Sequence, residues 1–123
     1  MKTIATSDAP AAIGTYSQAK VVGNLIFTSG QITLAAATGE VSGQDVAAQA
    51  HCSIQNLGAI LEAAGSSFEK VIKTTCFLAD MADFAAFNAV YEQYFTGKPA
   101  RSCVAVKALP KGVLCEVEAI AEI

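Results

Sequence analysis

The side chains best able to do chemistry lie in the last stretch of the chain, between Ala100 and Ile123. This stretch holds Arg101, Cys103 and Glu116. A guanidinium can bind a carboxylate through two parallel hydrogen bonds, and a carboxylate can accept a proton and return it. A thiol becomes a nucleophile when its surroundings lower its pKa. Together the three groups would suit a small anionic substrate.

The spacing in this stretch predicts a β-hairpin. Two apolar-rich runs flank Leu109–Gly112, which contains a proline and a glycine typical of a turn. Because side chains alternate between the faces of a strand, Arg101, Cys103 and Glu116 are expected on one face, with Cys103 roughly across from Glu116. We therefore expect the three groups to converge on one patch. The opposite face of the second run is apolar and carries Val113, Cys115, Val117, Ala119 and Ala121.

Each of the three residues also has a purely structural interpretation. Arg101 could form an ion pair, for example with Glu118, and Glu116 could be an ordinary exposed strand glutamate. Cys103 has no evident base to activate it, because the only histidine, His51, falls on a predicted helix that should cover the other sheet face. We therefore expect Cys103 to line a site without acting as a nucleophile, its backbone N–H helping to bind a carboxylate.

The elements that must position these residues follow from periodicity. Ser42 and Asp45 resemble a capping box, and an apolar stripe at steps of three and four then predicts a helix that stops at Gly65. Asp80 or Asp83 is expected to cap a second amphipathic helix with a buried stripe of aromatic residues. The expected strands before the hairpin are Lys2–Ala5, Tyr16–Val22, Leu25–Ser29 and Val71–Ala79, the middle two joined by a turn at Gly23 and Asn24.

This order of elements predicts an α/β (α+β) fold, a two-layer sandwich of one mixed sheet and two helices. At 123 residues the chain is expected to form a single domain, 1–123. The helices should cover the apolar sheet face and leave Arg101, Cys103 and Glu116 on the uncovered one. Only 15% of the residues are charged while 53% are hydrophobic, so we expect other subunits to cover some apolar surface.

Composition also excludes several classes of function. The net charge is −3 and no run of adjacent basic residues exists, which argues against a nucleic-acid partner. No apolar run approaches the roughly 20 residues of a membrane span, so no membrane partner is expected. The four cysteines form no CxxC pair, and His51 with Cys52 alone is a weak ligand set, so no metal is expected. Unpaired cysteines favour a cytoplasmic protein.

Several separate stretches, in the same order, resemble the Rid family of reactive intermediate deaminases (RidA, formerly YjgF). The resemblance covers nearly the whole chain. The stretches are AIGTYSQA, FTSGQI, TGEV, NLGAILEAAGSSFEKVIKTTCFLADMADFAAFNAVYEQYF and PARSCVAVKALPKGVLCEVEAIA.

The resemblance implies a homotrimer of chorismate-mutase-like subunits, whose sheets form a central barrel with a cleft between each pair of subunits. It implies hydrolysis of 2-imino acids, formed from enamines such as 2-aminoacrylate, to 2-oxo acids and ammonia. Pyridoxal-phosphate (PLP)-dependent dehydratases release those enamines, and the family needs no cofactor of its own. By motif, the implied catalytic residues are Glu116 and Arg101, and the implied substrate-binding residues are Arg101, Cys103, Tyr16, Ser29, Gly30 and Asn88.

Three other functions are alternatives to the deaminase. A trimer could bind 2-oxo acids for regulation without turning them over, using the same Arg101. An endoribonuclease or translation inhibitor is disfavoured because a basic stripe and a pair of histidines are both missing. A purely structural role would leave Arg101 and Glu116 replaceable.

Overall fold

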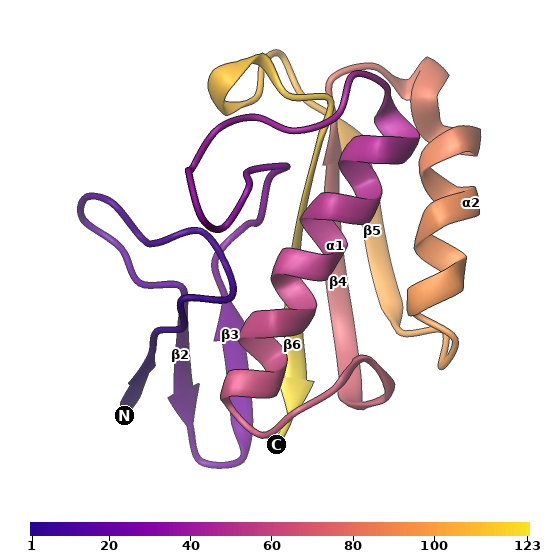
Figure 1. Ribbon diagram of the computed structural model, residues 1–123. Coiled ribbons are helices and arrows are strands. Elements are labelled where there is room, and N and C mark those ends of the chain that lie inside the picture. The colour runs from indigo at the N-terminus through magenta and orange to yellow at the C-terminus, as the bar shows by residue number, and fades with distance from the viewer.

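Six strands form one mixed sheet in the order β1-β2-β3-β6-β4-β5 in the computed structural model, which describes residues 1–123 (Figure 1). All neighbouring strands are antiparallel except β4 and β5, which are parallel. The strands are β1 (Lys2–Ile4), β2 (Ala19–Val22), β3 (Leu25–Thr28), β4 (Val71–Leu78), β5 (Ala100–Ala105) and β6 (Cys115–Glu122).

Two helices complete the predicted two-layer sandwich. Helix α1 (Val46–Ala63) begins one residue after Asp45, whose side chain accepts a hydrogen bond from the Ala48 amide at 2.8 Å. The expected start at Ser42 is therefore three residues early, since Gly43 has a φ of 85° that a helix does not contain. A short 3-10 turn that Asp80 caps leads into α2 (Phe84–Tyr94).

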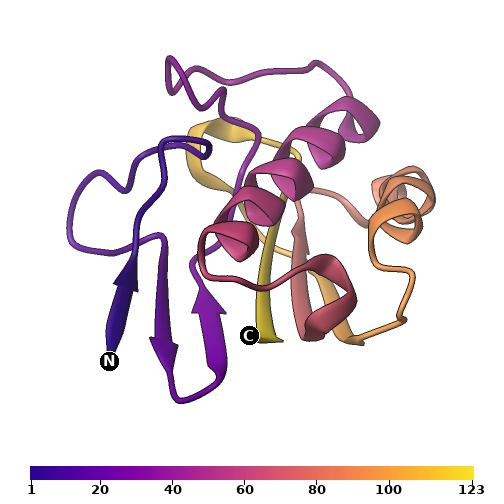
Figure 2. The same cartoon turned by 60° about the horizontal axis from the view of Figure 1, so that its bottom comes forward.

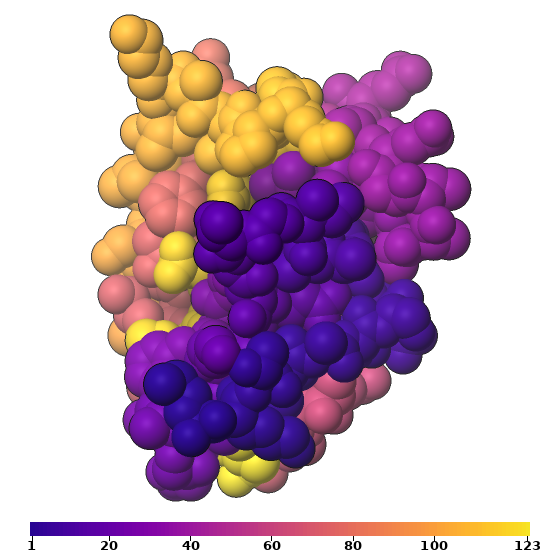
Figure 3. Space-filling model, turned by 90° about the vertical axis from the view of Figure 1, so that its left-hand side faces the viewer, coloured from indigo at the N-terminus to yellow at the C-terminus, as the bar shows by residue number.

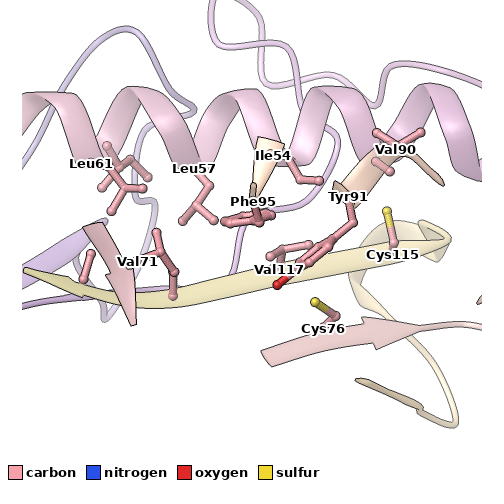
Figure 4. Packing of buried hydrophobic residues seen from close by; sticks show 14 of the residues in the cluster. Ile54, Leu57, Leu61, Val71, Cys76, Val90, Tyr91, Phe95, Cys115 and Val117 are labelled. Carbon is pink, nitrogen blue, oxygen red and sulfur yellow. The ribbon is translucent and has the colours of Figure 1, made fainter. Parts of the chain in front are cut away.

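Both helices lie on the same face of the sheet, as the two cartoon views show (Figures 1 and 2). The apolar stripe of α1 packs on the central strands, where Ile54, Leu57 and Leu61 are fully buried (Figure 4). Cys76 and Cys115 are also fully buried in this core, where they pack as small hydrophobic residues.

The predicted hairpin between the last two strands is wrong. Strand β5 pairs with β4 alone, and β6 lies between β3 and β4. The residues 106–114 that connect the two strands form a loop with a 3-10 turn at Pro110–Gly112, long enough to cross the two strand spacings, about 10 Å, that separate β5 from β6. The turn signal correctly predicts that the chain reverses, but the reversal passes around the end of β4.

The face of the sheet that the helices leave uncovered is rich in apolar side chains. Phe27 is 40% exposed and Val104 45% exposed, and strand pairing places Phe77 and Ile120 on the same face. Charged residues on this face include Glu116 and Glu118 of β6. A large apolar surface beside a few charges is typical of a face that packs against another molecule.

Candidate active site

Five of the seven candidate site residues line two separate hollows, and Ser29 and Cys103 line neither. The first, which we call the glutamate hollow, has a volume of about 340 Å³; its lining includes Tyr16, Gly30, Lys111 and Glu116. The second, which we call the arginine hollow, has a volume of about 360 Å³; its lining includes Asn88, Tyr91, Lys98 and Arg101. The loop that carries Tyr16 and the loop that precedes β6 lie side by side on one side of the molecule (Figure 3).

Glu116 reaches the glutamate hollow from β6, on the uncovered face of the sheet. Gly30 makes room for it, because a Cβ atom at that position would overlap the Oε2 atom of Glu116. Burial, and secondly the nearby charge of Glu118, raise the pKa of the Glu116 carboxyl. A half-buried carboxyl with a raised pKa is suited to exchanging protons nearer to neutral pH than an exposed glutamate.

Tyr16, Ser29 and Gly30 approach Glu116 from the N-terminal part of the chain. Tyr16 is 55% exposed, so it is free to contact a ligand. The Ser29 amide donates to the carbonyl of Gln18 at 2.9 Å and its hydroxyl donates to the carbonyl of Ser17, so Ser29 joins two chain segments. The Gly30 amide has no hydrogen-bond partner in the chain, so it is better able than the Ser29 amide to donate a hydrogen bond to a ligand.

Arg101 reaches the arginine hollow from β5, on the helix-covered face. Its Nη1 donates to Asn88 Oδ1 at 2.7 Å. The guanidinium carbon lies 4.7 Å from the centroid of the Tyr91 ring and 5.5 Å from that of Phe84, which are cation–π distances. Asn88 is the one side chain that hydrogen-bonds Arg101, so most of the donors of the guanidinium have no protein partner.

Cys103 lies next to Arg101 on the same face of β5, opposite Cys76 of β4. Burial raises the pKa of the Cys103 thiol, and the charge of Arg101 offsets this only in part, so the thiol is protonated at neutral pH. His51 lies between the two helices, where its Nδ1 contacts the Tyr94 hydroxyl at 2.8 Å. It lines neither hollow, and no base activates Cys103.

The expected convergence of Arg101, Cys103 and Glu116 on one patch is therefore wrong. Cys103 is in register with Cys76, and Glu116 is in register with Phe77, which points to the other face of β4. The same register excludes an ion pair with Glu118 inside one chain, because Glu118 is opposite Thr75 on the uncovered face.

Several residues that line the hollows or contact Arg101 are not evident from the sequence. The periodicity assigns Phe84 and Tyr91 only to a core stripe, although their spacing around Asn88 places all three on one side of α2. Lys98 and Lys111 are the two non-glycine residues with positive φ, at 53° and 57°. Their only signal in the sequence is the glycine next to each of them.

The structure shows no cluster of potential metal ligands and no helix able to cross a membrane. No group of three His, Cys, Asp or Glu side chains is arranged to hold a metal ion. Neither helix has the length and apolar character needed to cross a membrane.

Known proteins resemble this chain over its full length. A family model described as endoribonuclease L-PSP matches residues 6–123. A relative from Escherichia coli K12 named 2-iminobutanoate/2-iminopropanoate deaminase is 56% identical over 124 residues, which covers 98% of this chain and 96% of that protein. The solved structure of the YjgF gene product from E. coli has a TM-score of 0.94 and 54% identity, covering 99% of this chain and 98% of that one. E. coli TdcF with bound serine has a TM-score of 0.94 and 47% identity, covering 100% of this chain and 99% of that one.

Proposed function

Because this chain belongs to the endoribonuclease L-PSP family, also called the YjgF/RidA family, we propose that it is a 2-iminobutanoate/2-iminopropanoate deaminase that hydrolyses 2-imino acids to 2-oxo acids and ammonia. The name of the relative that is 56% identical supports a hydrolytic deaminase. The observation that carries the proposal is Glu116, a half-buried carboxyl with a raised pKa in an open hollow.

The two hollows supply complementary parts of this reaction. A 2-imino acid has a carboxylate beside an electrophilic C=N carbon, so it needs an anion-binding group and a group that manages protons. Arg101 binds the carboxylate through its unpaired donors, with help from Asn88 and the backbone N–H of Cys103. Glu116 holds the water, and the free amide of Gly30 and the Tyr16 hydroxyl contact the ligand.

The reaction then follows from proton transfer at Glu116. The water oxygen forms a bond to the imine carbon while Glu116 accepts a proton from the water, and Glu116 returns that proton to the nitrogen, which becomes an amine. Glu116 then accepts the remaining hydroxyl proton and passes it to the amine, so the C–N bond breaks and ammonia leaves as the C=O bond of the 2-oxo acid forms. This route needs no covalent bond to Cys103, whose thiol is protonated.

The opposite placement of Arg101 and Glu116 means that one chain does not bring both to one substrate. We propose that a homotrimer assembles through the apolar uncovered face, and that Arg101 of one copy meets Glu116 of the next at each seam. The exposed apolar side chains of that face support this arrangement. Each seam then holds one complete site.

A coupled assay tests the reaction. A PLP-dependent dehydratase generates 2-aminoacrylate, which tautomerises to 2-iminopropanoate, and the release of pyruvate and ammonia is followed with and without this protein. We expect faster release with the protein. An unchanged rate, together with tight binding of a 2-oxo acid, would instead favour a regulatory binding protein.

A mixing experiment tests the shared site. Arg101→Ala and Glu116→Gln, each nearly inactive alone, are unfolded, mixed and refolded together. We expect activity to return to about a quarter of that of the wild type, because random assembly pairs the two intact side chains in about one seam in four. No recovery in trimers that contain both variants would contradict a site divided between copies.

A further inference from the structure

The guanidinium of Arg101 is held by one side of α2. Phe84, Asn88 and Tyr91 stand at successive turns of this helix, with ring centroids 5.5 Å and 4.7 Å from the guanidinium carbon for Phe84 and Tyr91 and a 2.7 Å hydrogen bond to Asn88. Residues three and four apart lie on the same side of a helix. A polar acceptor is thus flanked by two aromatic rings at the point where the arginine ends.

Tyr91 is itself held by two contacts. Its side chain is almost fully buried, and its ring stacks on that of Phe95 with centroids 4.4 Å apart and planes at 28°. Its hydroxyl forms a 2.7 Å hydrogen bond with the hydroxyl of Thr74, which is fully buried on β4. The ring reaches from α2 toward the sheet (Figure 4).

Thr74 and Arg101 are register partners on the parallel strands β4 and β5, and their side chains share the helix-covered face. Tyr91 therefore contacts both members of one strand pair, Thr74 through its hydroxyl and Arg101 through its ring. The contact with Thr74 sets the height and tilt of the ring above the sheet, and the ring sets where the guanidinium can lie.

We propose that Tyr91 is a positioning residue for Arg101, with Thr74 as its anchor. An aromatic face attracts a cation without using its N–H donors or neutralising its charge, whereas a carboxylate partner would do both. Burial raises the pKa of Tyr91, so the ring stays neutral at physiological pH. The guanidinium is thereby oriented while most of its donors remain available for the carboxylate of a substrate.

The catalytic consequence of this inference rests on the proposed deaminase function, but the positioning itself does not. The first test therefore needs no ligand. In ¹⁵N-labelled protein, the Nε–Hε signal of Arg101 is assigned from its loss in Arg101→Lys. We expect this signal to be shifted upfield by the Tyr91 ring in the wild type, to lose that shift in Tyr91→Leu and to keep most of it in Tyr91→Phe.

Phe87→Leu is the matched control. Phe87 is a fully buried aromatic residue of the same helix, and its ring makes no cation–π contact with Arg101. We expect this variant to keep the Arg101 signal in place. Thr74→Val serves where Tyr91→Leu does not fold, and it should move the signal in the same direction because the ring loses its anchor. A signal that stays in place in Tyr91→Leu, or in Thr74→Val when that variant replaces it, would overturn the inference whatever reaction the protein catalyses.

The second test measures turnover. Loss of a cation–π contact corresponds to about a 3- to 30-fold loss of kcat/KM. In Tyr91→Leu we expect this loss as a higher KM, with kcat nearly unchanged. Tyr91→Phe should recover most of it. In an Arg101→Ala background, Tyr91→Leu should have no further effect, because it acts through the arginine. An equal further loss in that background would make Tyr91 a structural residue only. A wild type without turnover would refute the proposed function, and the NMR signal alone would then decide whether Tyr91 positions Arg101.

Discussion

Arg101 and Glu116 lie on opposite faces of the same sheet, Arg101 beside Thr74 under α2 and Glu116 beside Phe77 on the uncovered face. The two residues that the proposed reaction needs most are thus separated by the sheet itself. A substrate small enough to be a 2-imino acid can touch both only if they come from different copies of the chain.

Arg101→Ala should lower kcat/KM by about two to three orders of magnitude, because a sheltered, charge-assisted contact is worth roughly 2–5 kcal/mol and each ~1.4 kcal/mol is tenfold in rate. Arg101→Lys should recover only part of the loss, since an ammonium lacks the planar fork. Steady-state kinetics and light scattering on the same preparations give the measurement. Activity that falls only in step with loss of assembly would make Arg101 an interface residue.

Glu116→Gln should keep the shape of the glutamate hollow and remove its proton acceptor. General acid–base catalysis is worth about 10²- to 10⁴-fold, so we expect a loss of kcat in that range. Binding of 2-oxobutanoate, measured by calorimetry, should be nearly unchanged because the carboxylate contact is at Arg101. Full turnover in this variant would remove Glu116 from the mechanism.

The same substitution should raise stability in a pH-dependent way. The folded protein raises the pKa of Glu116, so folding favours the protonated form. The stability that the protonated carboxyl contributes is fully present below the pKa of the unfolded state, about 4.3, and is lost as the pH rises through the pKa of the folded state. Urea unfolding should therefore show Glu116→Gln to be more stable than the wild type at pH 7, with the difference shrinking toward pH 4. A constant difference across this range would mean that ionisation of Glu116 costs no stability.

Cys103→Ser should retain most of the deaminase activity, because burial raises the pKa of the thiol and no base contacts it. The thiol should also react slowly with iodoacetamide at pH 7, which mass spectrometry of the labelled peptide can follow. A loss as large as that of Arg101→Ala would show that the sulfur takes part in the reaction.

The helices were predictable because their signals are local. The stripe of α1 depends on residues three and four apart, and the Ile54, Leu57 and Leu61 positions are buried as expected. The predicted alternation of side chains within each of the last two strands, β5 and β6, was also correct. Arg101 and Cys103 share one face of β5, and Glu116 is on the face of β6 opposite Cys115 and Val117.

The relation between those two strands was not predictable in the same way. A turn signal at Leu109–Gly112 shows that the chain reverses, but which strand becomes the neighbour depends on packing with distant residues. The assignment of faces failed for a related reason. A charged side chain is expected to avoid the covered face, whereas Arg101 lies against the Tyr91 ring with its charged end at the hollow.

The apolar uncovered face also bears on how the stability of the fold would depend on protein concentration. If copies cover Phe27, Phe77, Val104 and Ile120 for one another, association stabilises the folded chain by mass action, and Tm rises with protein concentration. Dilution would then dissociate the copies, which would remove the shared sites and lower the stability of each folded chain at the same time. In a cell, the number of complete sites would rise more than in proportion to the expression level, because each site requires two chains to associate.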